Sequence, residues 1–418
     1  MRVLLITAYF PPDTGSAAHL FYELGTALVE RGHEVWVVTG FPGYHAEGDL
    51  SRYRGKLAMR EAYDGLSVSR IAVPQLPRHI PIARGIWQFA CSASFSLAAL
   101  RVPKPDVALV YSPPLPLGFT GWKTRMLRGV PFVFNVQDLF PQSVIDLGLL
   151  TNKPLIRLFE GLERFVYQRA AHITVHSSGN RDHVVDQKGA QPDQVTVLPN
   201  WVDTTFLKPA PKDNEFSREH GLHGKFIVSF AGVIGYSQDL DVVLDAAQRL
   251  HDYPEIHFLI VGDGVDKERL EQRAQELGLS NVTFLPMQPR SRYPSILHAS
   301  DVSLATLHAD VQTPVVPSKI LSIMAAGRPV VAALDPSGDA PQLIADADCG
   351  VALAPEDAEA LAEAVLKLYN DPDLCESFGA NGRSYAERHL SLEAAAGHYE
   401  RLFETVIDVP PRKEARSE

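Results

Sequence analysis

The chain has 418 residues, 45% of them hydrophobic and 21% charged, a composition typical of a globular protein with two or three cores. Its formal net charge of −11 argues against general nucleic-acid binding, and no stretch reaches the roughly 20 apolar residues of a membrane span. Three cysteines, Cys91, Cys349 and Cys375, lie too far apart for a disulfide framework or a zinc site, so a reducing compartment is expected.

Apolar strands alternate with amphipathic helices in both halves of the chain. A first strand is expected at Val3–Thr7, followed by a helix that buries Leu20, Leu24, Ala27 and Leu28 and ends at Gly32. The remaining strands are expected at Val35–Thr39, Asp106–Tyr111, Phe132–Val136, Ile173–Val175, Val195–Leu198, Phe226–Ala231, Ile256–Val261, Val282–Leu285, Asp301–Ala305 and Pro329–Ala333. This alternation predicts an α/β protein with two parallel, doubly wound sheets.

The segment from Lys208 to Asn214 is rich in proline and polar residues, as expected of a domain linker. We therefore expect Rossmann-like domains at residues 1–205 and 215–385. A last helix, at residues 391–407, carries an apolar stripe that includes Tyr399 and Phe403, and we expect it to pack back on the N-terminal domain.

The region from Arg78 to Arg128 is basic, with seven arginines and lysines against one acid, Asp106. It contains the apolar segment Ile86–Leu100. Two interpretations are open: the segment rests on an anionic membrane surface, or it is a buried helix with solvated flanking charges.

Two sheets joined by a linker leave a cleft, and ligands of such sheets bind at the carboxyl ends of the strands. Gln137 and Asp138 directly follow a buried strand, where polar groups either bind a ligand or satisfy local backbone. Other candidate loops, each of which is also compatible with a plain turn, are Asp13–Ser16, Phe41–His45, Ala231–Gly235 and Gly262–Gly264.

The segment Val315–Val331 reads as a loop, a helix that ends at Gly327, and a strand. Ser318 is expected to cap the helix, and Lys319 adds positive charge beside its unpaired N–H groups. This arrangement suits a nucleotide diphosphate, while an ordinary αβ unit with a surface lysine fits the residues equally well.

Taken in order along the chain, the loop motifs resemble those of the retaining glycosyltransferases of the fourth sequence family, which have the two-domain GT-B fold with a central cleft. The similar motifs are Tyr9-Phe-Pro-Pro, Arg31-Gly-His-Glu-Val, Gly40-Phe-Pro-Gly-Tyr, Tyr111-Ser-Pro-Pro-Leu, Val136-Gln-Asp-Leu-Phe-Pro-Gln-Ser, Leu198-Pro-Asn-Trp-Val-Asp, Gly262-Asp-Gly and Pro317-Ser-Lys-Ile. Within the family, the chain is most similar to transferases of bacterial surface polysaccharides, of the fucosaminyl and colanic-acid branch.

The resemblance implies a nucleotide-sugar donor, with a UDP-sugar favoured over a GDP-sugar, and transfer of a hexosyl or N-acetylhexosaminyl group to a glycan or lipid-linked acceptor. It implies neither cofactor nor metal, and a cytoplasmic location at the inner face of the membrane. Retention without a carboxylate nucleophile implies front-face displacement, in which the leaving phosphate helps to deprotonate the acceptor.

Residue roles also follow from the resemblance. Lys319 and the Gly15 backbone would hold the diphosphate, where charge develops on the leaving group, and Asp138 and Gln137 would contact the donor sugar. Backbone groups from Leu285 to Met287 would hold the base. The other expected donor-binding residues are Ser16, Gly232, Gly235, Gln238, Ser318 and Ser322.

The chain departs from the family pattern at three places. Val233 and Gln238 stand where many members carry an arginine and a lysine, and Gln137 replaces a histidine. Ser322 stands where a glutamate usually receives the ribose hydroxyls, and Pro314 falls near the position of its partner glutamate. Two other functions therefore remain open: a nucleotide-sugar epimerase on the same fold, and a catalytically weakened homologue that binds nucleotide or glycan.

Overall fold

The computed structural model describes residues 1–13, 16–43, 46, 50–74, 81–146, 148, 150–311 and 316–408, and for Ser16, Pro81, Ile82 and Arg84 it describes the backbone alone. The chain forms two compact units. Unit 1 comprises Met1–Asn200 and the segment that begins at Leu392, and unit 2 comprises Trp201–Ser391.

Unit 1 is built on an eight-stranded sheet in the order β3-β4-β2-β1-β5-β6-β7-β8, parallel except for the antiparallel pair β3–β4. Its strands are β1 (Arg2–Ile6), β2 (Glu34–Gly40), β3 (Ala58–Tyr63), β4 (Leu66–Ile71), β5 (Val107–Ser112), β6 (Phe132–Val136), β7 (His172–Val175) and β8 (Val195–Val197). Neither β3 nor β4 is among the predicted strands, and the predicted wholly parallel sheet is wrong at this edge.

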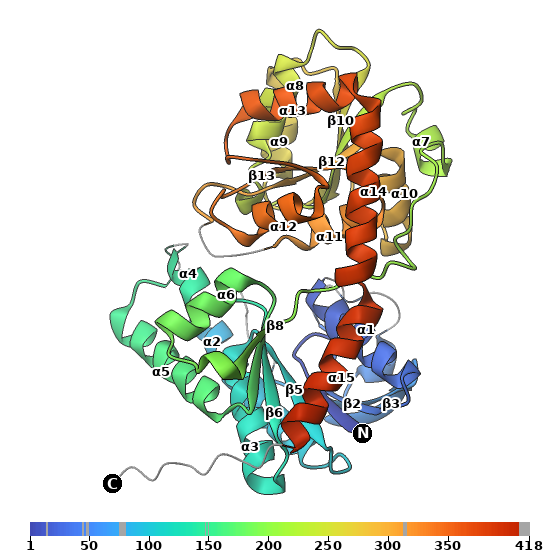
Figure 1. Cartoon of the computed structure of the whole chain (residues 1–418). Helices are drawn as coiled ribbons and strands as arrows, with labels where there is room; N and C mark the ends of the chain where they lie inside the picture. The colour runs from blue at the N-terminus through green and yellow to red at the C-terminus, as the bar shows by residue number, and fades with distance from the viewer. Residues whose placement is uncertain are drawn as a thin grey trace. The chain divides into compact units, whose positions relative to one another are not determined.

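Helices cover both faces of this sheet. They are α1 (Ser16–Glu30), α2 (Pro81–Ala99), α3 (Gly118–Arg128), α4 (Gln142–Asp146), α5 (Lys153–Arg169), α6 (Ser178–Asp182) and α15 (Leu392–Asp408). Helices α2, α3 and α5 contribute to one core, whereas α1 and α15 lie side by side (Figure 1). The predicted core face of α1 is partly wrong: Leu20 is only half-buried, and Phe21 is buried with its ring edge-on to Tyr111.

Polar contacts fix α15 to the rest of unit 1. The Asn135 amide on β6 donates to the Tyr399 hydroxyl over 3.0 Å. Near the first helix, Glu400 pairs with Arg31 at 2.5 Å and with His33 at 2.9 Å. The last helix is therefore an integral part of unit 1.

Helix α2 is apolar on two sides. Trp87, Cys91 and Phe95 on one side are buried in the core. Ile86 and Leu97 on the other side are 57% and 46% exposed. The segment thus has both a buried face and a bare apolar face. Within the described residues, no helix has the length and apolar character needed to cross a membrane.

Unit 2 has a six-stranded parallel sheet in the order β11-β10-β9-β12-β13-β14. Its strands are β9 (Phe226–Val233), β10 (Ile256–Asp263), β11 (Val282–Leu285), β12 (Val302–Thr306), β13 (Val330–Ala333) and β14 (Gly350–Leu353). All but β14 are among the predicted strands.

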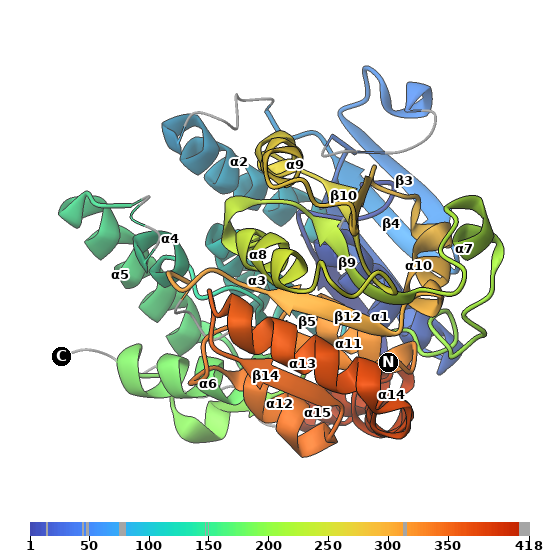
Figure 2. The ribbon, with the colours of Figure 1, turned by 90° about the horizontal axis from the view of Figure 1, so that it is seen from above.

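The helices of unit 2 also form two layers. They are α7 (Glu215–Glu219), α8 (Asp241–Arg249), α9 (Lys267–Glu276), α10 (Tyr293–Ala299), α11 (Ser318–Ala325), α12 (Asp339–Ala347), α13 (Ala358–Asn370) and α14 (Pro372–His389). Helices α8, α9 and α13 share one core, with α8 and α13 side by side (Figure 2). Helices α7, α10, α11, α12 and α14 supply the cores of the opposite face. This α/β architecture agrees with the predicted fold class.

Candidate functional site

The loops that follow β9 and β10 are packed against each other at the carboxyl end of the unit 2 sheet. A Cβ atom on Gly262 would lie 1.9 Å from the Gly232 carbonyl oxygen, and one on Gly264 would lie 2.1 Å from the Ile234 carbonyl oxygen. The loop packing therefore requires glycine at both positions. Gly235 differs, because its φ of −119° suits any residue and no atom lies within 4 Å of a Cβ placed there.

The Lys319 ammonium lies directly beneath this glycine loop. Lys319 is the second residue of α11, and its Nζ donates to Gln238 Oε1 over 2.6 Å. The same Nζ lies 3.7 Å from the centre of the Phe230 ring. Burial lowers the pKa of Lys319 from 10.5 to about 7. Among the described residues, no carboxylate forms an ion pair with Lys319, so this half-buried cation lacks a counter-charge from that part of the chain.

The first turn of α11 differs from the prediction. Pro317 takes the N-cap position and the helix has no side-chain cap, so the predicted capping role of Ser318 is wrong. Ser322 Oγ donates to the Ser318 carbonyl at 3.4 Å and also hydrogen-bonds the hydroxyl of Tyr293, whose pKa burial raises to about 12. The Ser322 hydroxyl thus has partners within unit 2, while the first N–H groups of α11 keep the positive end of the helix dipole.

Exposed apolar side chains follow three neighbouring strands at the carboxyl end of this sheet. Val233, Val265 and Met287 are 64%, 75% and 47% exposed and follow or end β9, β10 and β11. Tyr236, in the short helix η5 (Tyr236–Gln238), is 68% exposed. Of these four, only Met287 is among the residues predicted from the sequence to bind the donor. Apolar residues directly after the loop glycines were the available signal for the others.

The loop after β11 is the expected base-binding segment. Its Leu285 carbonyl accepts a hydrogen bond from Lys267 Nζ at 3.3 Å, and Lys267 also donates to the Gly262 carbonyl at 3.0 Å. Lys267 therefore ties this loop to the glycine loop after β10.

Gln137 and Asp138 lie in unit 1, directly after β6. Gln137 Nε2 donates to Asn135 Oδ1 at 3.1 Å, and Gln137 Oε1 accepts from Asn200 Nδ2 at 2.8 Å. Both ends of the Gln137 amide are thus bonded within unit 1. Burial, the neighbouring Tyr9 and the charge of Asp138 together raise the pKa of Tyr111, so the Asp138 carboxylate lies near this phenol.

The structure brings Gly232, Gln238, Ser318, Lys319 and Ser322 together around the start of α11. Gly235 belongs to the same loop as Gln238, and their backbones are joined by a 2.9 Å hydrogen bond. Several predicted positions lie outside the described residues, namely Gly15, Tyr44, His45 and Pro314. Ser16 begins α1, and its side chain is likewise outside the description.

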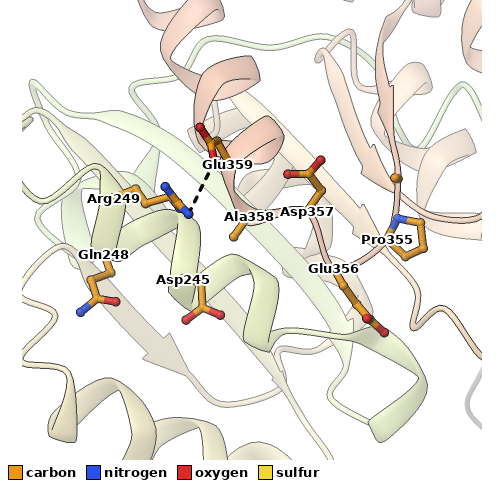
Figure 3. Close-up of a pocket in the computed structure, with 9 residues that line it drawn as sticks. Asp245, Gln248, Arg249, Pro355, Glu356, Asp357, Ala358 and Glu359 are labelled. Carbon is orange, nitrogen blue, oxygen red and sulfur yellow. Dashed lines mark ion pairs between the residues drawn. The ribbon is translucent and has the colours of Figure 1, made fainter.

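Two hollows in unit 2 lie apart from Lys319. The first, of about 780 Å³, is lined by α8, the loop before α13 and the start of α13 (Figure 3). Its acidic residues Asp245, Glu356, Asp357 and Glu359 outnumber Arg249, which pairs with Glu359 at 3.8 Å. The second, of about 510 Å³, is also rich in carboxylates and includes Asp239 and Asp266. Acidic linings of this kind do not suit an anionic ligand. Within the described ranges, no group of three or more His, Cys, Asp or Glu side chains is arranged to hold a metal ion.

Comparisons with known proteins cover nearly the whole chain. A glycosyl transferase 4-like domain matches residues 14–201, and a domain of the glycosyl transferases group 1 matches residues 212–385. The putative colanic acid biosynthesis glycosyl transferase WcaI of Escherichia coli strain K12 is 28% identical over 94% of this chain and 97% of its own length. The probable glycosyltransferase WbjE of Pseudomonas aeruginosa is 26% identical over 76% of this chain and 79% of its own length.

Solved structures share the fold at lower sequence identity. Sucrose-phosphate synthase from Thermosynechococcus elongatus superposes with a TM-score of 0.76 and 18% identity, covering 97% of this chain and 98% of its own. Anabaena Alr3699/HepE in complex with UDP superposes with a TM-score of 0.73 and 17% identity, covering 97% of this chain and all of its own. With both domain models matched in order and the whole fold shared, the chain belongs to the group 1 glycosyl transferases and has the GT-B fold.

Proposed function

We propose that this glycosyltransferase moves a hexosyl or N-acetylhexosaminyl group from a UDP-sugar to a lipid-linked glycan acceptor during the synthesis of a bacterial surface polysaccharide. The observation that carries the proposal is the half-buried Lys319 ammonium, which lacks a carboxylate partner in the described structure and lies at the first turn of α11. An uncompensated cation beside free helix N–H groups favours a ligand that brings its own negative charge.

In this mechanism Lys319 binds the donor diphosphate and stabilises the charge that grows on it as the sugar leaves. The glycine loop after β9 lets the phosphates approach the backbone, and the apolar side chains of Val265 and Met287 flank the base. Asp138 and Gln137 in unit 1 bind the donor sugar. The leaving phosphate takes the acceptor proton while the new bond forms on the same face, which gives retention without a metal ion.

The names of the relatives support the choice of donor and pathway. WcaI is described as a colanic acid biosynthesis transferase, and the HepE structures contain UDP or UDP-glucose. The proposed base of the donor, the proposed acceptor and the proposed retention of anomeric configuration all rest on this similarity and on the Lys319 site.

A nucleotide screen tests the donor part of the proposal. A ligand that binds only the folded protein raises its melting temperature, so the purified protein is heated with UDP, GDP, ADP or dTDP, with and without magnesium. We expect UDP to raise the melting temperature regardless of magnesium, and Lys319→Ala to abolish this shift. Lys367→Ala, an exposed lysine on α13, is the matched control. An undiminished shift in Lys319→Ala would remove Lys319 from the site.

A transfer assay tests the reaction. Radiolabelled UDP-sugars are incubated with bacterial lipid extract, and the anomeric configuration of the product is determined by NMR. The same donors without extract reveal an epimerase, because epimerisation consumes donor without an acceptor. A second candidate function is a nucleotide-binding homologue with weakened catalysis. It is favoured because the Ser322 hydroxyl already hydrogen-bonds to Ser318 and Tyr293. Nucleotide binding without turnover in the wild type, with turnover restored by Ser322→Glu, would establish that candidate.

We also propose that the bare face of α2 contacts an anionic membrane surface at the cytoplasmic face of the cell membrane, where a lipid-linked acceptor would be found. Its exposed side chains Ile86, Phe89 and Leu97 recur at helical spacing, and the neighbouring helix α3 carries basic residues. Arg125 and Arg128 are unsuitable for mutation, because they donate to the Arg169 carbonyl at 2.6 Å and the Ala99 carbonyl at 2.8 Å and so hold the fold.

The membrane contact is tested with vesicles that contain phosphatidylglycerol and with vesicles of phosphatidylcholine alone. The triple variant Ile86→Ser, Phe89→Ser, Leu97→Ser should lose cosedimentation with the anionic vesicles. The control variant Leu57→Ser, Tyr253→Ser removes exposed apolar side chains elsewhere and should bind as the wild type does. If the triple variant binds the anionic vesicles as well as the control variant and the wild type do, this role of α2 is refuted.

A further inference from the structure

Two side chains fix the position of the Lys319 ammonium, and both are held by rigid elements. Phe230 is fully buried within β9, with its ring centre 3.7 Å from Nζ. Gln238 accepts from Nζ through Oε1, while its own backbone carbonyl accepts from the hydroxyl of Thr306 on β12. The ammonium therefore rests between a core ring and an anchored amide.

Neither neighbour neutralises the charge. A ring face attracts a cation through its quadrupole, and an amide oxygen attracts it through a dipole, but both are uncharged. Two other lysines differ, because each has a carboxylate partner: Lys188 lies 3.2 Å from a Glu163 oxygen, and Lys212 pairs with Asp301. In the described structure, no carboxylate offsets the charge of the protonated Lys319.

The ammonium also retains hydrogen-bonding capacity. Of its three N–H groups, one is directed to Gln238 in the described structure, and the ring offers no lone pair. A Cβ placed on Gly232 would lie 3.9 Å from both Cε and Nζ, so the glycine leaves the side of the lysine that faces the loop uncrowded.

We propose that Phe230 and Gln238 are positioning residues for Lys319, which hold its ammonium in place without neutralising it so that the donor diphosphate supplies the missing negative charge. This inference rests on the proposed donor site and adds the two residues that fix the position of the positive charge in that site.

Nucleotide binding should therefore be coupled to the protonation of Lys319. Because burial lowers the pKa of Lys319 to about 7, part of the free protein carries a neutral lysine above neutral pH. A bound diphosphate favours the charged form and raises this pKa, so binding takes up a proton and weakens as the pH rises. The other titratable groups near this loop include Tyr293, which stays protonated, and Asp239, whose pKa burial raises. They also include Asp263, Lys267 and His308, and His308 lies near Asp310 and Glu356.

The test is isothermal titration calorimetry with UDP at about pH 7, 7.5 and 8, where about nine-tenths or more of the UDP phosphate is fully ionised. Repeating each titration in buffers of different ionisation enthalpy measures the protons taken up. We expect the wild-type affinity to fall with rising pH and proton uptake to accompany binding. His308→Gln should preserve both effects, because it removes the imidazole and leaves Lys319 in place.

Phe230→Leu removes the ring face and Gln238→Leu removes the amide. Each should weaken UDP binding about 3- to 30-fold at about pH 7 and move the onset of the affinity loss to lower pH. Gln238→Glu should move the onset to higher pH, because a carboxylate stabilises the ammonium, and should weaken binding by competing with the diphosphate. Phe258→Leu, a fully buried ring on the neighbouring strand β10, is the matched control and should leave the pH profile unchanged.

These variants distinguish the donor site itself from the positioning role of Phe230 and Gln238. If Lys319→Ala loses UDP binding while Phe230→Leu and Gln238→Leu keep the wild-type affinity and pH profile, the positioning role is overturned and the donor site stands. If Lys319→Ala binds UDP as the wild type does, the donor site is wrong and this inference falls with it. Gln238 is only half-buried, so Gln238→Leu decides the question even if Phe230→Leu fails to fold.

Discussion

The Tyr399 hydroxyl lies 3.0 Å from the side-chain nitrogen of Asn135, although 264 residues separate the two in the chain. Burial raises the pKa of Tyr399 to about 12, so the hydroxyl stays protonated at neutral pH. Asn135 Oδ1 in turn accepts from Gln137, one of the proposed sugar-binding residues. The last helix of the chain therefore helps to set the position of Gln137.

Tyr399→Phe removes this hydroxyl and should lower the free energy of unfolding by about 1–2 kcal/mol, because Asn135 then loses a buried partner. The change is measured by urea unfolding. Tyr253→Phe, at a residue that is 37% exposed, serves as the control and should have little effect. Equal stability of Tyr399→Phe and the wild type would show that the contact adds nothing to the fold.

Replacing Lys319 should stabilise the ligand-free protein. Its pKa falls from 10.5 to about 7 through burial, so between these values the unfolded chain binds more protons than the folded one and stability rises with pH. The free-energy cost of burying the charged lysine is fully present below about pH 7 and disappears as the pH rises towards 10.5. At about 1.4 kcal/mol per pKa unit, and with part of the cost relieved by relaxation, Lys319→Met should gain roughly 1–3 kcal/mol at neutral pH. Melting curves from pH 6 to about pH 10 test this, and a gain that grows with pH would contradict it.

The glycine loops can be tested by adding one methyl group. Gly264→Ala would place Cβ 2.1 Å from the Ile234 carbonyl oxygen, at a φ of +155° that L-residues rarely adopt. We expect the free energy of unfolding to fall by about 3 kcal/mol or more, as for other strained or overpacked sites.

Gly235→Ala is the control for this loop, because its Cβ would meet no atom within 4 Å. Its melting temperature should match that of the wild type, while UDP binding should weaken if the phosphates approach this backbone. A large loss of stability in Gly235→Ala would show that the loop packs more tightly than the structure indicates.

His257 makes the protein sensitive to acid. Burial lowers its pKa from 6.5 to about 4, and its Nε2 lies 2.9 Å from Thr283 Oγ1. Between these values the unfolded chain binds more protons, so stability is lost as the pH falls from 6.5 towards 4, by up to about 3 kcal/mol. His257→Gln keeps a polar partner for Thr283 and should flatten the melting temperature over this interval. The exposed His251 is the control, and an identical acid response in His257→Gln would exclude the buried imidazole as the cause.

The sequence predicted the fold where the pattern was local. Long apolar runs identified most strands of both sheets, whereas β3 was missed because its residues are alternately exposed and half-buried and look polar. A readable signal lay next to it: Asp64 and Gly65, with φ of 46° and 82°, form a two-residue turn between β3 and β4. The missed β14 is a four-residue strand at the sheet edge, too short for a clear pattern.

The site was predictable only in part. Lys319 and the loop glycines stand out because helix starts and strand ends can be located from local patterns. The contact of Gln238 with Lys319 joins residues that are 81 positions apart, and the Phe230 ring looks like any core residue in the sequence. Ser318 was misplaced as a cap because Pro317 takes that position, and one residue lies within the usual uncertainty of helix boundaries.

The polypeptide leaves unit 1 at Asn200–Trp201 and returns to it at Ser391–Leu392. Both connections meet in unit 2, where the Val202 N–H donates to the Leu390 carbonyl over 2.8 Å. A hybrid enzyme made by a single fusion near residue 200 would thus receive its final helix from the wrong parent, with a mismatched surface against α1 and β6. Grafting residues 201–391 as an inserted cassette would keep each parent's unit whole, and so offers the cleaner way to exchange nucleotide sites between relatives.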